Sequence, residues 1–506
     1  MLQASIIADK DYRIGNVERT MFGVLIEHLG RHIYTGMYEP GHPTADADGF
    51  RQDVIDLVKP LNLGLVRYPG GNFVSGYKWE DTIGPKENRP TRLELAWGTI
   101  ETNQFGLHEF VAWCRKIGAE PYLAVNLGTR GPEEARNLVE YCNHPGGTYW
   151  SDLRRKNGAE EPFNIKYWGL GNEMGGSWQI GMKTADEYAR IALEAAKVMK
   201  WTDPTIHIIA DGFSDMTWRW KALQSCYHLA DYLSIHCYLG NRNGDSAEFM
   251  GAADSLTDMM ESTAAVCDAV QADKRQKRRM NIALDEWNVW YHENESTCPD
   301  PKWVPARHMI EDVYTMEDAL VVGDQLISIL NHADRVKIAC MAQLVNVIGT
   351  IMTEPNGRCW TQTTYHPFLL TSNLAKGTVL KTLVTSPVYD SDHRKGINTL
   401  STAMTYDDTT RQLTIFAVNR SLTEQLEVNM ELRAFGGTPS LTGWKSLYND
   451  DLKAVNTADK PNNVTPVELT DFTVKDGKAV FTLPKASWNV SVGYFVAVGS
   501  FSGSAV

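Results

Sequence analysis

The stretch IKYWGLGNE, residues 165–173, is a short apolar and aromatic run that ends in an asparagine and a glutamate. A run of this kind is typical of a buried parallel strand that delivers its last residues to one edge of the sheet. Seven further segments share this character, and each is separated from the next by glycine-containing, polar or amphipathic sequence. In chain order the candidate strands are FGVLIEHLG (22–30), LGLVRYPGG (63–71), PYLAVNLG (121–128), IKYWGLGNE (165–173), IHIIADG (206–212), YLSIHCY (232–238), NIALDEWN (281–288) and KIACMAQLVN (337–346).

Amphipathic segments between these strands predict helices. They include DGFRQDVIDLVKPL (48–61), QFGLHEFVAWCRKIG (104–118) and TADEYARIALEAAKVMK (184–200), which carry apolar residues near positions i, i+3, i+4 and i+7. Alternating strands and helices indicate a parallel sheet, and eight strands are the number that closes a (β/α)8 TIM barrel. We therefore expect a barrel over residues 17–376.

After residue 376 the sequence pattern changes to short segments in which apolar and polar residues alternate, separated by turns. We interpret residues 377–506 as a C-terminal antiparallel β-sandwich of the jelly-roll kind, with Lys-Asp-Gly (475–477) as a hairpin turn. The strand segments are RQLTIFAVNRS (411–421), QLEVNMELRAF (425–435), LTDFTVKDGKAVFTL (469–483) and SWNVSVGYFVAVG (487–499). The N-terminal segment 1–16 has no helix partner, and we expect it to pair with this sandwich.

Charge and composition narrow the class of partner. The 506 residues have a formal net charge of −13, which argues against nucleic acid and anionic membranes as partners. No apolar run resembles a signal peptide or a membrane span, so the sequence predicts a soluble, cytoplasmic protein. The eight scattered cysteines form no CxxC pair, and we expect free, buried thiols.

Polar residues gather at the ends of the candidate strands, where a (β/α)8 barrel places its active site. A ring of carboxylates, amides and aromatic side chains at one mouth suits a ligand with several hydroxyl groups. The members are Glu27, His28, Arg67, Asn72, Asn126, Asn172, Glu173, His236, Tyr238, Asp285, Glu286, Asn288, Gln343 and Asn346.

Glu173 and Glu286 each follow an apolar strand, and burying a carboxylate there is costly unless it is paired or used. Retaining glycoside hydrolysis requires two carboxyl groups about 5–5.5 Å apart, one that protonates the leaving oxygen and one that attacks the anomeric carbon. Asn172 precedes Glu173, and its amide can bind the sugar 2-hydroxyl. The sequence therefore predicts a retaining glycosidase with these two catalytic glutamates.

Six segments of the chain resemble the α-L-arabinofuranosidases of glycoside hydrolase family 51, in clan A. The matching segments are FGVLIEHLGRHIYTGMYEP (22–40), VRYPGGNFVSGYKWEDTIGP (66–85), YWGLGNEMGG (167–176), SIHCY (234–238), IALDEWNVWY (282–291) and AQLVNVIGTIMT (342–353). They span the barrel in order, and the terminal sandwich also fits that family.

The resemblance implies Glu173 as acid/base and Glu286 as nucleophile, with no metal and no organic cofactor. It also implies that Glu27, Asn72 and Asn172 hold sugar hydroxyls and that Tyr238 and Gln343 lie near the nucleophile and the sugar. Arg67 should pair with Glu286, whose charge should raise the pKa of Glu173. The implied partners are an arabinofuranosyl-containing oligosaccharide or polysaccharide and further copies of the chain in a homo-oligomer, a trimer or a hexamer.

Several readings of single residues stay open at this point. Glu27 could be a buried ion-pair partner of Arg67, and His236 could serve only to orient its neighbours. Trp97 could stack on a sugar face or pack in the core, and Trp303 lies in a long segment beside the nucleophile that could wall the site.

Three other functions compete with an arabinofuranosidase. An endo-β-glycanase would use the same barrel and the same two glutamates on glucan or xylan. An inactive sugar-binding protein would not need to keep a nucleophile. Metal-assisted proton abstraction would need about three clustered carboxylates and a basic residue, a set that the strand ends do not offer.

Overall fold

The structure is a computed structural model, and it describes residues 1–213, 215–436 and 438–496. Eight strands close into a parallel barrel in the order β10-β11-β2-β3-β6-β7-β8-β9. Their bounds are β2 Gly23–Leu25, β3 Leu65–Tyr68, β6 Glu120–Val125, β7 Tyr167–Leu170, β8 His207–Asp211, β9 Tyr232–Leu239, β10 Asn281–Val289 and β11 Val336–Ala342. Each overlaps one of the eight predicted strands, so the predicted barrel is confirmed.

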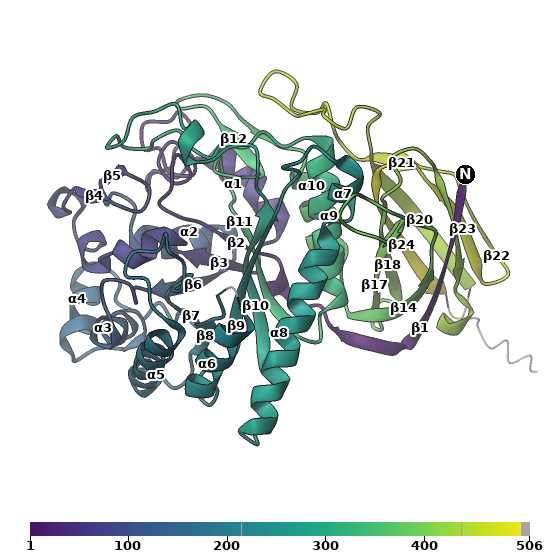
Figure 1. The fold of residues 1–506 in the computed structure, drawn as a ribbon. Coiled ribbons are helices and arrows are strands. Elements are labelled where there is room, and N and C mark those ends of the chain that lie inside the picture. The colour runs from purple at the N-terminus through teal and green to yellow at the C-terminus, as the bar shows by residue number, and fades with distance from the viewer. Residues whose placement is uncertain (214, 437, 497–506) are drawn as a thin grey trace, which may run out of the picture.

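Helices surround the barrel (Figure 1). The helix α5 shows how the sequence sets their limits, because Thr184 and Glu187 form a capping box in which the Glu187 carboxylate accepts from the Thr184 backbone N–H at 2.8 Å. The helices are α1 Gln52–Val58, α2 Leu107–Ile117, α3 Pro132–Asn143, α4 Tyr149–Lys156, α5 Ala185–Thr202, α6 Met216–Cys226, α7 Ser246–Met250, α8 Ala253–Asp273, α9 Met316–Asn331 and α10 Tyr365–Leu374.

Apolar side chains fill part of the barrel interior as one cluster. Its buried members are Leu65, Tyr122, Ile209, Ala283, Ile338 and Cys340. The interior is therefore a packed core rather than a pore, as expected for a barrel of eight strands. The polar side chains at the ends of the strands therefore lie at the mouth of the barrel, beyond this apolar core.

A β-bulge in β10 changes which side chains face the interior. The pairing with β9 joins Ala283 to Ser234 and then Glu286 to His236, so β10 has one residue more than its neighbour over this stretch. An extra residue of this kind re-aims the side chains that follow it. As a result, the consecutive residues Asp285 and Glu286 both contribute to the interior network described below.

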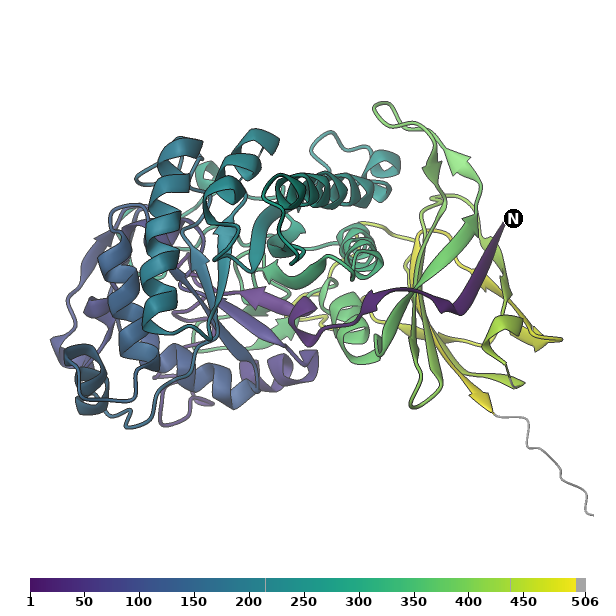
Figure 2. The same ribbon diagram turned by 90° about the horizontal axis from the view of Figure 1, so that it is seen from below.

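The second part of the chain forms a ten-stranded sheet in the order β21-β20-β24-β18-β17-β14-β1-β19-β23-β22. The N-terminal strand β1 begins in this sheet and leads toward the barrel, and it pairs antiparallel with β14 and parallel with β19 (Figure 2). The strands are β1 Leu2–Asn16, β14 Thr378–Thr385, β17 Leu400–Asp407, β18 Gln412–Asn419, β19 Leu426–Glu431, β20 Thr438–Leu447, β21 Val467–Leu469, β22 Phe472–Lys475, β23 Lys478–Leu483 and β24 Ser487–Val496. Residues 497–499 of the last predicted strand lie outside the described residues.

Short hairpins complete the fold. In the hairpin of β22 and β23, Lys475 pairs with Lys478, and Asp476 and Gly477 between them have φ values of 52° and 73°. Two residues with positive φ make the tight turn that suits a β-hairpin, at the predicted place. The remaining two-stranded sheets join β4 Arg92–Glu94 to β5 Thr99–Glu101, β12 Ile351–Thr353 to β13 Cys359–Thr361, and β15 Val388–Tyr389 to β16 Ile397–Asn398. Among the helices of the described ranges, none is long and apolar enough to span a membrane.

The helix α9 lies between the barrel and the sandwich (Figure 1). Gly323 in α9 faces the fully buried Trp488 of β24, and a Cβ atom on Gly323 would stand 2.2 Å from the indole ring. Beside it, the buried Arg420 after β18 forms an ion pair of 2.7 Å with Asp324. The two parts of the chain are therefore packed tightly against each other.

The contact between Gly323 and Trp488 generates a prediction of unusual sign. Helix propensity alone would make Gly323→Ala stabilising by about 1 kcal/mol. The clash with the indole should outweigh this gain and lower the free energy of unfolding by about 1–3 kcal/mol. Urea denaturation followed by tryptophan fluorescence measures the difference. In a Trp488→Leu background, where the indole is absent, Gly323→Ala should cost less than it does in the wild type. A Gly323→Ala variant more stable than the wild type would contradict the packing described here.

Candidate active site

Glu286 lies on β10, and two neighbours hold its carboxylate. The Arg67 Nη1 group donates to Glu286 Oε1 at 2.6 Å, and the Tyr238 hydroxyl donates to Glu286 Oε2 at 2.8 Å. Only 7 % of the Glu286 side chain is exposed, so bulk water does not compete with these two partners for the carboxylate oxygens. The carboxylate is therefore fixed in one orientation and balanced by a cation.

Glu173 follows β7 in a tight turn rather than on the strand itself. Its φ is 45°, a left-handed conformation that the surroundings must impose on a glutamate. The next residue anchors the turn, because the Met174 backbone N–H donates to Asp211 Oδ2 at 2.8 Å. Glu173 Oε1 lies 2.9 Å from His236 Nδ1, and Glu173 Oε2 accepts from the Trp178 indole at 2.8 Å.

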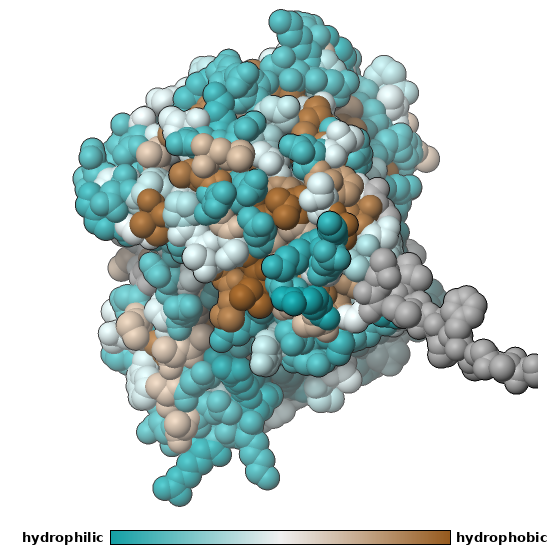
Figure 3. Space-filling model, turned by 90° about the vertical axis from the view of Figure 1, so that its right-hand side faces the viewer, coloured by the Kyte–Doolittle hydropathy of each residue, from teal (hydrophilic) through white to brown (hydrophobic). Residues whose placement is uncertain are grey.

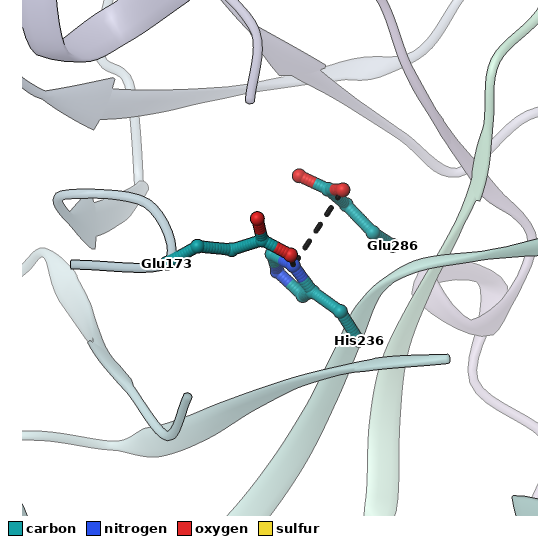
Figure 4. Close-up of side chains that lie close together, drawn as sticks. All are labelled: Glu173, His236 and Glu286. Carbon is teal, nitrogen blue, oxygen red and sulfur yellow. Dashed lines mark hydrogen bonds and ion pairs between the residues drawn. The ribbon is translucent and has the colours of Figure 1, made fainter. Parts of the chain in front are cut away.

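The side chains of Glu173 and Glu286 point toward each other, and the His236 ring lies beside them (Figure 4). An oxygen of each carboxylate and a ring nitrogen of His236 all lie within 4.8 Å of one another. This spacing suits a carboxyl pair about 5–5.5 Å apart, in which one group attacks directly. It is too short for the roughly 6.5–9.5 Å that leave room for a water molecule in an inverting pair.

Arg67 joins three members of the site from its place on β3. Besides Glu286 it contacts Asn172, whose Oδ1 accepts from Arg67 Nη2 at 2.6 Å, and Asp285, whose Oδ2 is 3.3 Å from Arg67 Nε. Because Oδ1 of Asn172 is occupied in this way, its amide nitrogen is left as a donor. That nitrogen is buried and has no hydrogen-bond partner among the described residues. It is the group that a sugar hydroxyl could satisfy.

Glu27 forms a second polar cluster beside the catalytic pair. Its carboxylate accepts from the Phe73 backbone N–H at 3.0 Å, the Trp97 indole at 2.9 Å and the Gln343 amide at 3.1 Å. Arg67 makes its ion pairs with Asp285 and Glu286 instead. Burial raises the pKa of Glu27 to about 7, with the charge of Glu286 adding to the effect and the hydrogen bonds opposing it.

Asn72 begins the turn after β3, directly after Gly71, and is partly exposed. The position of a Cβ on Gly71 would be 3.0 Å from Glu286 Oε1, 3.4 Å from Glu27 Oε2 and 3.5 Å from Asn172 Nδ2. The glycine therefore leaves open a space that three polar groups border. A ligand placed there would contact the carboxylates of Glu286 and Glu27 and the free amide nitrogen of Asn172.

Other predicted members of the polar ring do not join this cluster. Asn126 donates to the backbone of Tyr77, and Asn288 donates to the backbone of Ala342. Asn346 binds Thr353, and His28 pairs with Glu101 behind the site. Trp303 contacts the rim through its backbone, since its N–H donates to the carbonyl oxygen of Gly98 next to Trp97. These residues hold loops in place.

Asp285 and Trp178 are close neighbours of the catalytic pair to which the sequence patterns assigned no role. Asp285 was noted at a strand end, but strand alternation places it on the face opposite to Glu286, and the bulge in β10 overrides that alternation. Trp178 reaches back to Glu173 from five residues further along the chain. No periodicity marks such a turn, although an aromatic residue soon after a strand-end glutamate is a weak signal.

The predicted shift in the pKa of Glu173 was wrong in sign: the pKa was expected to be raised, and it is lowered. Burial raises its pKa, but the hydrogen bond and charge of His236 and the hydrogen bond from Trp178 outweigh burial, so the pKa of Glu173 is lowered. Burial lowers the pKa of His236, whereas the charge of Glu286 and the bonds to Asp285 and Glu173 raise it well above its usual value. The two opposite pKa shifts favour a charged imidazolium of His236 beside an ionised Glu173.

Two family models match the chain. One, described as the α-L-arabinofuranosidase C-terminal domain, covers residues 285–487, and the other, the α-L-arabinofuranosidase 1 domain, covers residues 57–259. A relative from Bacillus subtilis (strain 168), named intracellular exo-α-(1→5)-L-arabinofuranosidase 1, is 48% identical over 97% of this chain and 99% of its own length.

Two proteins of Bifidobacterium longum extend the comparison. One, named exo-α-(1→6)-L-arabinofuranosidase, is 43% identical over 96% of each chain. The other is AbfB, whose solved structure is described as a family 51 α-L-arabinofuranosidase. It superposes with a TM-score of 0.93 at 38% identity, over 98% of this chain and 100% of that one.

The raised pKa of Glu27 predicts a pH-dependent stability. A carboxyl that titrates near 4.5 when unfolded and near 7 when folded makes the free energy of unfolding fall as pH rises through that window. Glu27→Gln removes this proton exchange, so its stability relative to wild type should improve by up to about 3 kcal/mol between pH 4.5 and pH 7.5. Urea denaturation at each pH measures this difference.

The exposed Glu187 is a matched control, because its pKa is lowered by hydrogen bonds to Thr184. Glu187→Gln should keep a nearly constant difference from wild type between pH 4.5 and pH 7.5, and its relative stability should improve only as pH falls below that range. A difference between Glu27→Gln and wild type that stays constant over this pH range would contradict the raised pKa of Glu27.

Proposed function

Because the chain belongs to the α-L-arabinofuranosidases of glycoside hydrolase family 51, we propose that Glu286 and Glu173 remove a terminal α-L-arabinofuranosyl group by double displacement. The observation that carries this assignment is the approach of the two carboxylates to within 4.8 Å. Glu286 is the nucleophile in this proposal, and Glu173 is the general acid and then the general base.

In the first step Glu286 attacks the anomeric carbon while Glu173 delivers a proton to the leaving oxygen. Arg67 and Tyr238 hold the attacking carboxylate in place by donating to its two oxygens. In the second step a water molecule gives its proton to Glu173, and its oxygen displaces the ester of Glu286. The anomeric configuration is retained because the carbon is inverted twice.

The sugar ring is held by the groups that border Gly71. Asn172 Nδ2 is the donor for the 2-hydroxyl, a bond that strengthens as positive charge develops at the anomeric carbon. Glu27 accepts from a second hydroxyl, with Trp97 and Gln343 orienting its carboxylate, and Asn72 closes the same side. These assignments follow from position and from the unused hydrogen-bonding capacity of each group.

The names of the relatives support a proposal for the linkage that the enzyme cleaves. The one at 48% identity is named for α-(1→5) linkages and an intracellular location, and the one at 43% is named for α-(1→6) linkages. We assign this chain to terminal α-(1→5)-linked arabinofuranosyl groups of oligosaccharides in the cytoplasm. The endo-β-glycanase alternative is not favoured, since both relatives are named exo-acting arabinofuranosidases.

Initial rates of nitrophenol release from 4-nitrophenyl α-L-arabinofuranoside test the assignment. Wild type should act on this substrate and release arabinose faster from α-(1→5)- than from α-(1→6)-arabinobiose. Glu286→Ala should lose at least about 10³-fold in kcat/KM while still binding arabinose. Glu295→Ala is the matched control, because Glu295 is exposed on the segment after β10, and its rate should equal that of wild type.

Activity on 4-nitrophenyl β-D-xylopyranoside or on a β-glucan chain, without activity on the arabinofuranoside, would contradict the proposed substrate. An active Glu286→Ala variant would contradict the proposed nucleophile. Faster release from the α-(1→6) disaccharide would leave the mechanism intact and reverse the linkage.

The protein is also proposed to be a homo-oligomer, a trimer or a hexamer. The outer face of the sandwich has hydrophobic residues scattered among hydrophilic ones (Figure 3). Ile7 of β1 and Leu383 of β14 are paired neighbours with 53% and 63% of their surface exposed. Adjacent exposed aliphatic side chains support an interaction with another copy.

Light scattering during gel filtration should give three or six times the protomer mass of 56.7 kDa. Leu383→Lys should lower that mass if this face forms the contact. A wild-type monomer would contradict the proposed assembly, whereas an unchanged mass for the variant would move the interface to another face.

A further inference from the structure

His236 presents one ring nitrogen to the catalytic pair. On β9, its Nδ1 atom lies 2.9 Å from Glu173 Oε1 and 3.5 Å from Glu286 Oε2. The side chain is only 10% exposed, so water cannot easily replace these contacts. Nδ1 and Glu173 Oε1 are therefore within hydrogen-bond distance of each other inside the barrel, in a contact that bulk water does not replace.

The other ring nitrogen of His236 faces Asp285. The distance from Nε2 to Asp285 Oδ1 is 3.3 Å, and the Ser234 hydroxyl, which also donates to Asp285, lies at 3.3 Å from the same nitrogen. The Tyr122 hydroxyl donates to Asp285 Oδ2 at 2.7 Å, and Arg67 Nε is 3.3 Å away. All these neighbours donate to Asp285 or attract its charge.

An aspartate surrounded in this way stays ionised and acts as an acceptor. Burial raises its pKa, but Arg67, His236 and Ser234 outweigh burial and lower it. It therefore takes a hydrogen bond from Nε2–H and fixes the tautomer of the imidazole, as a carboxylate behind a histidine generally does. Nδ1 is then the nitrogen that must exchange a proton with Glu173.

Charged and titratable groups surround His236 on several strands. Asp285 and Glu286 face it from β10, Glu173 from the turn after β7, and Asp211 from β8, where burial raises the pKa of that carboxyl to about 7. Arg67 on β3 is the cation of this network. The excess of carboxylates favours a proton at the contact of His236 with Glu173 over a fully deprotonated pair.

We propose that His236 and Asp285 are positioning residues that store the acid/base proton: Nδ1 of His236 and Oε1 of Glu173 hold one proton in common, and Asp285 keeps it there. This inference rests on the proposed function and deepens it. It explains how a glutamate whose pKa is lowered can still act as a general acid, since the histidine supplies the proton that the glutamate delivers.

The proton balance of the reaction closes within this pair. When the glycosidic bond breaks, its electron pair stays on the leaving oxygen, which takes the shared proton. A carboxylate oxygen of Glu286 forms the new bond to the anomeric carbon. The pair is left as the Glu173 carboxylate and a neutral imidazole. In the second step water returns one proton to the pair, its hydroxyl oxygen bonds to the anomeric carbon, and Glu286 leaves as a carboxylate.

Asp285→Asn tests the storage of the proton, because it removes a charge and permits the other imidazole tautomer at nearly constant shape. The kcat/KM for α-(1→5)-arabinobiose, whose leaving alkoxide requires protonation, should fall by about 10²–10⁴-fold. The kcat/KM for 4-nitrophenyl arabinofuranoside should fall less than about tenfold, since nitrophenolate leaves with little protonation. The alkaline limb of the pH profile should move to lower pH by about one unit.

Two further variants distinguish a role in holding the proton from a purely structural role. Ser234→Ala removes a hydrogen bond to Asp285 but keeps its charge, so we expect a similar, small loss on both substrates and an unmoved alkaline limb. His236→Asn keeps a donor near Glu173 but cannot hold a titrating proton. It should reproduce the substrate split of Asp285→Asn, and it carries the test if that variant does not fold.

Equal losses on both substrates together with an unmoved alkaline limb, in a folded Asp285→Asn or His236→Asn variant, would overturn the proposal and leave these residues a structural role. Failure of the proposed function is a separate result, because it would appear as a wild-type enzyme that cleaves neither arabinofuranoside.

Discussion

The buried guanidinium of Arg67 is the interaction on which the rest of the site depends. Two consecutive carboxylates, Asp285 and Glu286, lie inside a barrel where an unpaired charge would cost several kcal/mol. Arg67 contacts both and also orients Asn172 at 2.6 Å. A planar group with several fixed donors can do this, whereas the single ammonium of a lysine could not reach three partners in one plane. The orientation of the nucleophile and the free amide nitrogen of Asn172 both follow from this one side chain.

Much of the architecture could be predicted because the strands are buried on both faces and appear as apolar runs. The polar residues that end those runs then meet at one mouth, which brought Glu27, Arg67, Asn172 and Glu286 together in the prediction. Asp285 was placed in the polar ring but was given no role, because a bulge in β10 breaks the alternation from which strand faces are inferred. The pKa of Glu173 was predicted with the wrong sign, since the distance of 2.9 Å to His236 depends on the fold and not on spacing in the sequence.

The sandwich supports the site from a distance. Its loop residue Lys453 forms an ion pair with the buried Glu317 at the start of α9, and Glu317 accepts in turn from Asn241 at 3.0 Å. Asn241 lies two residues beyond β9, the strand that carries His236 and Tyr238. A chain of contacts thus runs from the second sheet to the rim of the barrel. Gly323 against Trp488 is a second contact between the two parts.

In the proposed mechanism Glu286 forms a covalent bond to the sugar while Glu173 donates and accepts the proton. Intact-protein mass spectrometry of Glu173→Ala mixed with 4-nitrophenyl α-L-arabinofuranoside tests it directly, because a good leaving group permits the first step and the missing base slows the second. We expect an enzyme heavier by one arabinosyl group, with the added mass on Glu286 after proteolysis. An adduct on Glu27 or Asp285, or inversion of the anomeric centre with no adduct, would contradict it.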